Sequence, residues 1–566
     1  MSSGSSARRW VGQFLPSRQG MTLSGESFRS DLIAGITVSL VAIPQSLAYA
    51  QLAGVPAYYG LYAALIPSVV GALFGSSRQL STGPVAMTSL LTAASVAPLA
   101  AHGSELFYSY VILLALLSGV FQIAFGTLRI GVLLNFLSHP VLMGFINAAA
   151  LIIGLAQLPT LLGIPARQSE HFLLDIWHVV SHIDTMHEWS LGFGVSAILL
   201  LFGFKKFAPK LPGVLIVVAL LTWLSYTIGF ADMGGRIVGD IPQGLPSISV
   251  PPLDARASMD LLPAAFVIAL ISFMEAMSSS KVIAIKTRLP WDENKELIGQ
   301  GLAKVAAAFC HSMPVSGSFS RSALNLASNA RTPLSSLISA LFVLLTLLFF
   351  TSLLYHLPKP VLAAIIMMAV INLVNPRTIK SAWRANRDDG IAAVITFVAT
   401  LAFAPNIQNG IVTGILLSLS LLLYRMMRPR VAVLGLDHET RFRDAARHQL
   451  SVPHPKLGAI RFDGALRFIN VSYFEDALLK LERENPQLTH ILVKANGINE
   501  VDASGVEMIG NLVIRFRASG ITLAFSGLKK QVFEVIERTG LLQQIGEENI
   551  FTADREAWDA LSRRLD

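Results

Sequence analysis

The stretch Met313-Pro-Val-Ser-Gly-Ser-Phe-Ser-Arg-Ser-Ala-Leu-Asn325 lies in apolar surroundings and contains a proline, a glycine and four serines. Proline and glycine prevent an uninterrupted helix, so we predict that a short half-helix begins here, inside the membrane. The N-terminus of a helix presents free backbone N–H groups and a partial positive charge, and both favour an anion. Arg321, one turn into this helix, would add a full charge. The alternative is an arginine that snorkels from a helix end to the membrane interface.

A second stretch has the same construction in the first half of the chain. It reads Gln79-Leu-Ser-Thr-Gly-Pro-Val-Ala-Met-Thr-Ser89, and its Thr82 stands 234 residues before Ser316. Gln45 precedes this first break about as far as Glu275 precedes the second. Interrupted segments at corresponding positions of two halves are typical of inverted-repeat transporters, with the substrate between the two half-helix N-termini.

The composition places both breaks in a membrane protein. The chain has 566 residues, of which 53% are hydrophobic and 14% charged, with a net charge of +8 and a mean hydropathy of +0.58. Soluble domains carry about a quarter charged residues, so a wholly soluble protein is excluded. Residues 431–566 hold 17 Lys and Arg and 19 Asp and Glu, against 27 and 17 in residues 1–430. Two physically different bodies are therefore predicted to join near Arg430.

The first body contains eight long runs without Asp, Glu, Lys or Arg. A helix needs about 20 mostly apolar residues to cross a bilayer, and several of the runs are long enough for two spans. On this rule we predict roughly 10 to 14 spans. The runs are residues 32–77, 79–104, 130–166, 189–204, 211–231, 332–358, 360–376 and 390–424.

Basic residues in short loops indicate which ends of the spans face the cytoplasm. We interpret the basic clusters as cytoplasmic loops and not as nucleic-acid sites, which places both termini in the cytoplasm. No removable signal peptide is predicted, because residues 1–30 lack an apolar segment before a cleavage site. The clusters are Arg8, Arg9, Arg18 and Arg29; Lys205, Lys206 and Lys210; Lys281, Lys286, Arg288 and Lys295; Arg377, Lys380, Arg384 and Arg387; and Arg425, Arg428 and Arg430.

The tail is predicted to form a small cytoplasmic α/β domain. Short β-rich runs alternate with helical patterns, which favours a largely parallel or mixed sheet covered by helices. The expected strands are Ala459–Phe462, His490–Val493 and Ile521–Phe525, and the expected helices are Val471–Glu484, Ser504–Ala518 and Lys530–Thr539.

Glu275 is the acidic residue that the membrane body is least able to tolerate. It lies 14 residues past Leu261, about 21 Å along a helix that crosses an apolar slab about 30 Å thick. A carboxylate at this depth costs at least a few kcal/mol, and such groups usually mark ion or proton pathways. The alternative is a structural partner for Arg321, Lys304 or Lys281.

Several separated motifs in the chain resemble the sulfate permease (SulP) family, which includes the animal anion exchangers related to prestin. The tail sequence Val501-Asp-Ala-Ser-Gly505 resembles the STAS domain that these transporters carry. The membrane motifs are Asp31-Leu-Ile-Ala-Gly-Ile-Thr-Val, Ala42-Ile-Pro-Gln-Ser-Leu-Ala-Tyr-Ala, Gly60-Leu-Tyr, Phe74-Gly-Ser-Ser-Arg-Gln, Thr82-Gly-Pro and Gly317-Ser-Phe-Ser-Arg321.

The resemblance implies a polytopic α-helical membrane protein with a cytoplasmic α/β STAS domain. Fourteen transmembrane helices would form two inverted seven-helix repeats, at about residues 28–232 and 258–428, and would build a core domain that moves against a gate domain. A cytoplasmic segment of residues 1–27 would precede them, and the STAS domain would occupy residues 431–566. A homodimer is usual in the family.

The resemblance also assigns site residues. Glu275 matches the acidic position of the eighth span, and Ser279 matches a hydroxyl that helps to bind sodium in bicarbonate-transporting relatives. Those relatives have aspartate where this chain has Glu275, which favours protons over sodium as the coupling ion. Ser504 matches a residue that is phosphorylated in soluble STAS proteins, although the ordinary role of such a turn is helix capping by Asp502 or Ser504. The positions that match the anion site are Gln45, Tyr49, Val85, Ser318, Phe319, Ser320 and Arg321. The backbone N–H group of Ala86, next to Val85 at the start of the first half-helix, is expected to bind the anion with them.

Together these features predict a secondary active transporter of inorganic anions in the cell (inner) membrane, with sulfate as the first choice of substrate. Bicarbonate or C4-dicarboxylate symport, a passive anion channel and an anion receptor remain alternatives. The expected partners are a small anion, membrane lipid, a second copy of the chain and cytoplasmic proteins that bind the STAS domain, but no nucleic acid. No enzyme activity, cofactor or metal site is predicted: the chain has no Walker-type sequence and a single cysteine, Cys310.

Overall fold

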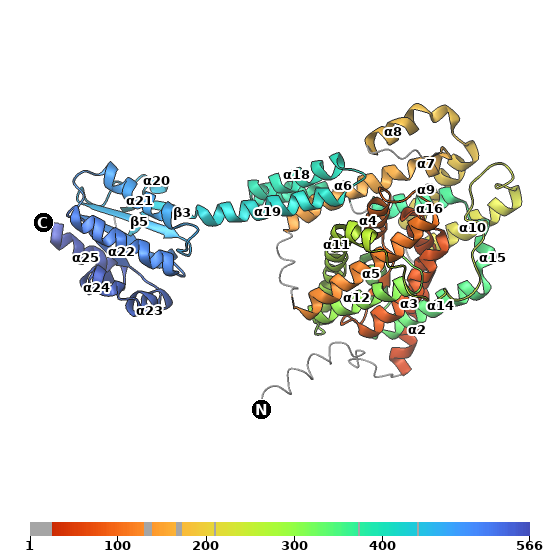
Figure 1. Cartoon of the computed structure of the whole chain (residues 1–566), viewed down its shortest axis with the longest axis horizontal. Coiled ribbons are helices and arrows are strands. Elements are labelled where there is room, and N and C mark those ends of the chain that lie inside the picture. Colours follow the sequence, from red (N-terminus) through yellow and green to blue (C-terminus); the bar gives the residue numbers. More distant parts are fainter. Residues whose placement is uncertain are drawn as a thin grey trace. The chain divides into compact units, whose positions relative to one another are not determined.

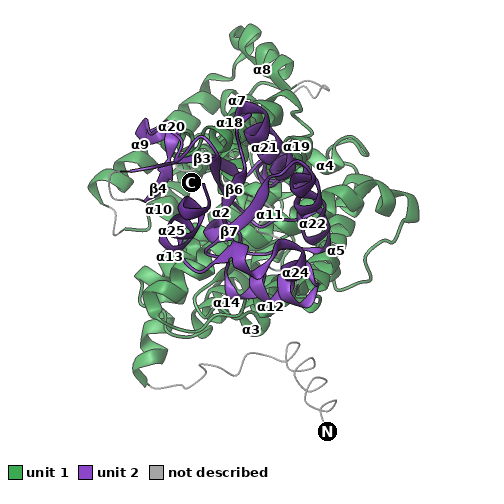
Figure 2. Ribbon diagram, turned by 90° about the vertical axis from the view of Figure 1, so that its left-hand side faces the viewer, with its two compact units in different colours: residues 1–418 green, residues 419–566 purple. Residues whose placement is uncertain are grey.

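The structure, a computed structural model, describes residues 25–129, 138–165, 172–208, 211–371, 374–437 and 441–565. The chain divides into two compact units, residues 1–418 and residues 419–566 (Figures 1 and 2). The division falls inside a helix, α19, whose C-terminal end continues to the first strand of the second unit. Most of the predicted N-terminal segment, residues 1–24, lies outside the described residues.

The first half of the membrane unit begins with two helices, α2 and α3, that lie largely within the uncharged run of residues 32–77. Pro67 lies inside α3 and Pro44 inside α2, the helix that carries Gln45 and Tyr49. The elements are α2 (Gly25–Leu52), α3 (Ala57–Phe74), β1 (Ser81–Gly83), α4 (Ala86–Val96), α5 (Glu105–Thr127), α6 (His139–Ala156), α7 (Leu158–Leu162), α8 (Phe172–Ser181), α9 (Glu188–Phe207) and α10 (Gly213–Ile228).

The second half repeats this order. A long helix that carries Glu275 comes first, and a short strand and a short helix again follow the second helix. The elements are α11 (Ala255–Thr287), α12 (Glu293–Phe309), β2 (Ser316–Ser318), α13 (Phe319–Ala327), α14 (Leu334–Phe349), α15 (Thr351–Leu354), α16 (Lys359–Val370), α17 (Pro376–Ala385), α18 (Arg387–Ala402) and α19 (Gln408–Met427).

Seven helices in the described ranges are long and apolar enough to cross a membrane by themselves. The other apolar helices in these ranges have 10–17 residues. One of them, Ala86–Val96, follows strand β1, as expected where a span is divided between a strand and a half-helix. The predicted helical membrane body is confirmed. The seven helices are Gly25–Leu52, Ala57–Phe74, Glu105–Thr127, His139–Leu162, Glu188–Phe207, Ala255–Thr287 and Asn409–Met427.

The membrane helices pack as two sets, and each set takes helices from both halves of the chain. In the set that we call the core set, α12 packs against α3 and α5, α11 against α4 and α5, and α14 against α2 and α3. In the gate set, α18 packs against α6, and α16 against α6, α7 and α9. The helix α2 touches the gate set through α10 and α16.

Buried polar side chains join the two halves within the core set. Asp31 accepts hydrogen bonds from the backbone N–H groups of Arg331 and Thr332, at 2.7 and 3.1 Å. Glu296 accepts from the N–H groups of Ser76 and Ser77, at 2.9 and 2.8 Å. Each buried carboxylate satisfies backbone donors at a helix connection from the opposite half, which ties the two halves together.

The second unit is an α/β domain built on a six-stranded mixed sheet, and every strand and helix predicted for the tail is confirmed to within two residues at each end. The strand order is β4-β3-β5-β6-β7-β8, antiparallel from β4 to β5 and parallel from β5 to β8. The strands are β3 (Arg430–Leu436), β4 (Phe442–Asp444), β5 (Leu457–Asp463), β6 (His490–Lys494), β7 (Thr522–Ser526) and β8 (Ile550–Phe551).

Helices cover both faces of this sheet. Ile460, Ile491 and Val493 face a core formed with α21 (Val471–Glu484), α22 (Ala503–Ala518), α23 (Lys530–Arg538) and α24 (Leu541–Ile545). Ala459 and Leu492 point to the other face, which α25 (Asp554–Leu565) covers. The strands therefore have apolar residues on both faces, as expected for a parallel sheet between helices. A short helix, α20 (Ala445–His448), follows β4.

The start of α22 shows which residue of the Asp-Ala-Ser-Gly turn caps the helix. Asp502 is the N-cap: one carboxylate oxygen accepts from the Gly505 N–H at 2.9 Å and the other from the Phe468 N–H at 2.8 Å. Ser504 lies in the first turn and is half-buried.

We expect Asp502→Ala to lower the free energy of unfolding of this domain by about 1–2 kcal/mol, the usual loss for an N-cap. Ser504→Ala should change it by less than about 0.5 kcal/mol. Urea unfolding of a fragment covering residues 429–566 measures both. Equal losses in the two variants would mean that Ser504 shares the capping role.

Candidate functional site

The two interrupted stretches meet in the core set as a short antiparallel ladder. Strand β1 pairs with β2, with Ser81 opposite Ser318, Thr82 opposite Gly317 and Gly83 opposite Ser316. Directly after these strands the half-helices α4 and α13 begin, at Ala86 and Phe319. Both predicted helix starts are thus confirmed, and the pairing brings together segments that stand more than 230 residues apart.

Buried side chains hold the ladder in place from several helices. Gln300 donates to Thr82 Oγ1 at 2.8 Å, and Ser68 donates to the Thr82 carbonyl at 2.7 Å. The Ser322 hydroxyl accepts from the Ser81 N–H at 2.9 Å, and Asn325 donates to the Gln79 carbonyl at 3.0 Å. A backbone interrupted at membrane depth needs such partners, because neither lipid nor the helices' own bonds can supply them.

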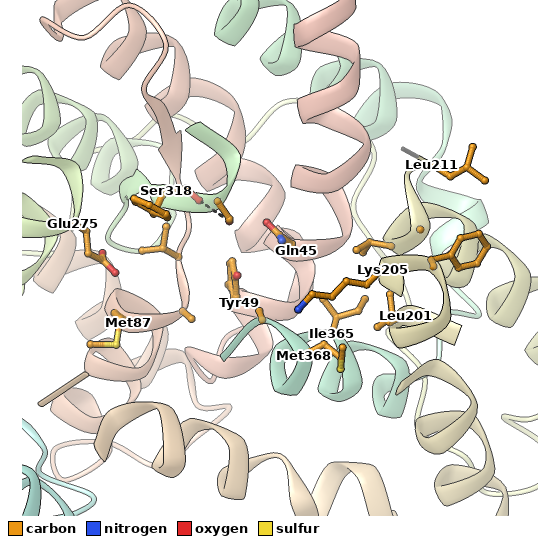
Figure 3. Close-up of a pocket in the computed structure, with 18 residues that line it drawn as sticks. Gln45, Tyr49, Met87, Leu201, Lys205, Leu211, Glu275, Ser318, Ile365 and Met368 are labelled. Carbon is orange, nitrogen blue, oxygen red and sulfur yellow. Dashed lines mark hydrogen bonds between the residues drawn. The ribbon is translucent and has the colours of Figure 1, made fainter. Parts of the chain in front are cut away.

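A cavity of about 520 Å³ opens beside the starts of the two half-helices (Figure 3). The core set contributes one wall and the gate set the other. The core wall consists of Gln45, Tyr49, Val85, Ala86, Met87, Glu275, Ser318, Phe319 and Ser320. The gate wall consists of Leu201, Phe204, Lys205, Leu211, Gly213, Val214, Ile365, Met368 and Ala369.

The core wall presents groups that suit an anion. The first N–H groups of α4 and α13 have no acceptor within their own helices, and the helix dipoles place partial positive charge at the same point. At α13, Ser318 accepts from the Arg321 N–H at 3.4 Å, which leaves the preceding N–H groups for a ligand. Gln45 Oε1 and Glu275 Oε2 are buried and receive no hydrogen bond from the described residues. Polar atoms of this kind usually find a partner in water or a ligand.

Glu275 brings a negative charge to a site otherwise suited to an anion. It lies on α11 and contributes to the core wall, at the opposite end of the cavity from Lys205 in Figure 3. The charged and titratable groups that act on it are Lys304 on α12, Arg321 on α13 and Tyr49 on α2. Lys304 is fully buried and donates to Gln122 and to Ser272, the latter at 2.5 Å.

Two of the residues assigned to the site lie outside the cavity lining. Arg321 is buried behind the ladder, where it donates to the Pro84 carbonyl at 2.9 Å and to the Ser81 hydroxyl at 3.4 Å. Arg321 lines a separate small void with Ser68 and Thr82. Ser279 is also buried, and its hydroxyl donates to the Glu275 carbonyl at 3.0 Å. The other assigned residues of the anion site, from Gln45 to Ser320, are brought together.

Sequence reasoning missed Lys205. We interpreted Lys205, Lys206 and Lys210 as a cytoplasmic loop cluster, but Lys205 lines the gate wall, and Figure 3 shows its side chain reaching into the cavity toward Gln45 and Tyr49. The sequence feature that could have identified it is its spacing from Leu201: residues four apart share one face of a helix, and Leu201 also lines the cavity. Lys210 lies outside the described residues.

The residues that the structure describes contain no group of three or more His, Cys, Asp and Glu side chains arranged to hold a metal ion. Cys310 is buried and carries a free thiol.

Gly317, in the ladder, is expected to tolerate no side chain. A Cβ atom there would lie 2.9 Å from Ala276 Cβ and 3.0 Å from Ala276 Cα, on the helix that carries Glu275. Overpacking of this kind costs about 1–3 kcal/mol. We therefore expect Gly317→Ala to lower anion uptake by about tenfold and to lower the melting temperature of the purified protein. Gly203→Ala is the control, because a Cβ at Gly203 would meet nothing within 4 Å. Wild-type uptake in Gly317→Ala would show that β2 can move away from α11.

In the membrane unit, two half-helices from different halves of the chain point their N-termini into one cavity. This arrangement defines a class of membrane transporters built from repeats. Here an α/β domain follows the membrane unit. The family comparison agrees with this class. The Sulfate permease family matches residues 28–396 and the STAS domain matches residues 451–557. The chain belongs to the Sulfate permease family and carries a STAS domain, which confirms the resemblance seen in the sequence.

Relatives are similar to the chain in sequence, and a solved structure is similar to it in fold. The chain is 34% identical over 550 residues to the probable sulfate transporter 4.2 of Arabidopsis thaliana, covering 94% of this chain and 80% of the relative. It is 32% identical over 538 residues to a probable sulfate transporter of Mycobacterium tuberculosis, covering 95% and 96%. The murine Solute Carrier 26 family member A9 anion transporter, solved in its inward-facing state, shares the fold with a TM-score of 0.86 at 20% identity, covering 98% of this chain and 93% of that one. The family and these relatives are transporters, not enzymes.

Proposed function

We propose that this anion transporter takes up sulfate together with protons. The observation that carries the proposal is the shared cavity at the N-termini of α4 and α13, where the first N–H groups, the Ser318 and Ser320 hydroxyls and the Gln45 amide surround a space suited to a small oxyanion. The sulfate transporters among its relatives support sulfate over other anions.

Glu275 is the proposed coupling group. When it is ionised, its charge opposes an anion in the same cavity. A proton on Glu275 removes this repulsion, so the anion and the proton favour each other's binding without direct contact. Sodium near Glu275 and Ser279 could act in the same way; we favour the proton because the carboxylate of Glu275 itself lines the cavity, whereas Ser279 does not.

The packing of the membrane unit supports an elevator-like movement of the core set against the gate set. The ladder, both half-helices and Glu275 all belong to the core set, so they can move as one body with the bound anion. We further propose that the protein works as a homodimer in the cell (inner) membrane, with both termini in the cytoplasm, and that the STAS domain binds cytoplasmic partners.

Uptake of labelled sulfate into proteoliposomes tests the proposal, with proton and sodium gradients imposed separately. Accumulation above equilibrium under the proton gradient is the expected result. Accumulation only with sodium would change the coupling ion. Uptake of bicarbonate or of C4-dicarboxylates in place of sulfate would change the substrate, and flux that never exceeds equilibrium would indicate a passive channel. Anion binding without flux would indicate a receptor.

A further inference from the structure

The cavity has a positive side chain on the wall that faces the half-helices. Among the described residues that line it, the charged ones are Glu275 on the core wall and Lys205 on the gate wall. Arg321, the cation that the sequence assigned to the anion site, points away from the cavity to the Pro84 carbonyl and the Ser81 hydroxyl. The full positive charge that faces the space is therefore that of Lys205 (Figure 3).

We propose that Lys205 is a substrate-binding residue of the gate set, and that its charge makes the site prefer dianions to monoanions. The proposal rests on anion transport through this cavity, as proposed above. It adds a second half to the binding site: the core set supplies N–H groups and hydroxyls, and the gate set supplies the cation.

The position of Lys205 on α9 supports this role. Lys205 lies one turn after Leu201, which also lines the cavity, so both side chains share the face of α9 that is turned to the half-helices. Lys206 is the next residue along and is rotated by about 100°. Its ammonium lies 5.3 Å from the centre of the Phe207 ring, and it is not part of the lining. The two lysines lie in the same turn of α9, but only Lys205 belongs to the cavity lining, so Lys206 is a matched control.

The charge of the ligand decides how much Lys205 contributes. The Coulomb energy between a fixed ammonium and an anion is proportional to the charge of the anion, so at equal distance a dianion gains twice as much as a monoanion. Backbone N–H groups and hydroxyls accept both kinds of oxyanion. Removing the ammonium should therefore change the affinity for sulfate by the square of the factor that applies to nitrate.

The location of Lys205 also links anion binding to the movement of the core set against the gate set. Because α9 belongs to the gate set, an anion held at α4 and α13 meets Lys205 only in arrangements that bring the two walls together. The cation then stabilises those arrangements more for a dianion than for a monoanion.

The test compares Lys205→Met, Lys205→Arg and Lys206→Met with wild-type protein in proteoliposomes. The readouts are the KM and maximal rate for labelled sulfate, and the concentration of nitrate that halves sulfate uptake at trace sulfate. For Lys205→Met we expect the sulfate KM to rise about tenfold and the half-inhibitory nitrate concentration to rise only about threefold. Lys205→Arg should restore most of the sulfate affinity, and Lys206→Met should match the wild type.

Equal changes for sulfate and nitrate in Lys205→Met would overturn the proposal, as would a sulfate KM equal to that of the wild type. A fall in maximal rate alone, with no rescue by arginine, would also overturn it and would indicate a structural role. If wild-type protein takes up a different anion and no sulfate, the sulfate assignment fails, and the same variants are compared with that anion as substrate. If wild-type protein binds and transports no anion, both proposals fail together.

Discussion

Replacing Arg321 with methionine is expected to reduce sulfate uptake by about 100-fold or more, although Arg321 does not reach the cavity. The side chain is 2% exposed and joins the second half of the chain to the first through the Pro84 carbonyl, at 2.9 Å. Without it, that carbonyl stays buried and unpaired, which costs about 1–3 kcal/mol. The small void behind the ladder also becomes larger, which lowers stability further. The two half-helix starts then lose their fixed spacing.

A second variant separates the effect of the charge of Arg321 on uptake from the effect of its hydrogen-bond geometry. Lysine keeps the charge but loses the planar guanidinium, so Arg321→Lys should restore only part of the uptake if the hydrogen bonds matter most. Full activity in Arg321→Lys would mean that the charge alone matters, acting through the ladder. Uptake at the wild-type level in Arg321→Met would contradict the bridging role. Melting temperatures and elution volumes of the purified variants show whether the protein itself remains folded.

Replacing Glu275 with glutamine should abolish the pH dependence of uptake. In the wild type, acidification on the side from which sulfate enters neutralises Glu275 and favours the anion, whereas alkalinisation restores the negative charge and opposes it. Wild-type uptake should therefore fall by about tenfold between about pH 5.5 and about pH 8. Glutamine has nearly the shape of the protonated acid and no charge, so Glu275→Gln should transport at a rate independent of pH and should no longer accumulate sulfate above equilibrium.

The groups around Glu275 define the controls for this experiment. Lys304, Arg321 and Tyr49 act on its charge from three different elements, and Lys205 lines the same cavity. Glu105→Gln is a matched acid-to-amide change at an exposed residue of α5 away from the lining, and it should keep the wild-type pH profile. Glu275→Gln with both a wild-type rate and a wild-type pH profile would make Glu275 a structural residue.

Much of the architecture follows from local features of the chain. Long uncharged runs can only be stabilised in a bilayer, and Pro84 and Pro314 lie in the two stretches where an uninterrupted helix gives way to a strand and a half-helix. In the tail, apolar runs bounded by turns predicted β5, β6 and β7, together with α21, α22 and α23. The strands β3, β4 and β8 and the helices α20, α24 and α25 were not predicted. Strand β3 follows the last span directly, β4 and β8 have three residues or fewer, and α20 and α24 have five or fewer. The helix α25 is rich in charged residues and has few apolar ones.

The sequence by itself therefore determined the membrane body, its two interrupted segments and the α/β tail, because apolar length, helix-breaking residues and alternation act over a few neighbouring residues. The antiparallel pairing of β1 with β2, the turning of Arg321 away from the cavity and the turning of Lys205 into it depend on the tertiary structure. The direction of a side chain follows from how its helix packs against distant helices. For this reason, Arg321, which the sequence assigned to the anion site, lies behind the ladder, and Lys205, which the sequence assigned to a loop, lines the cavity.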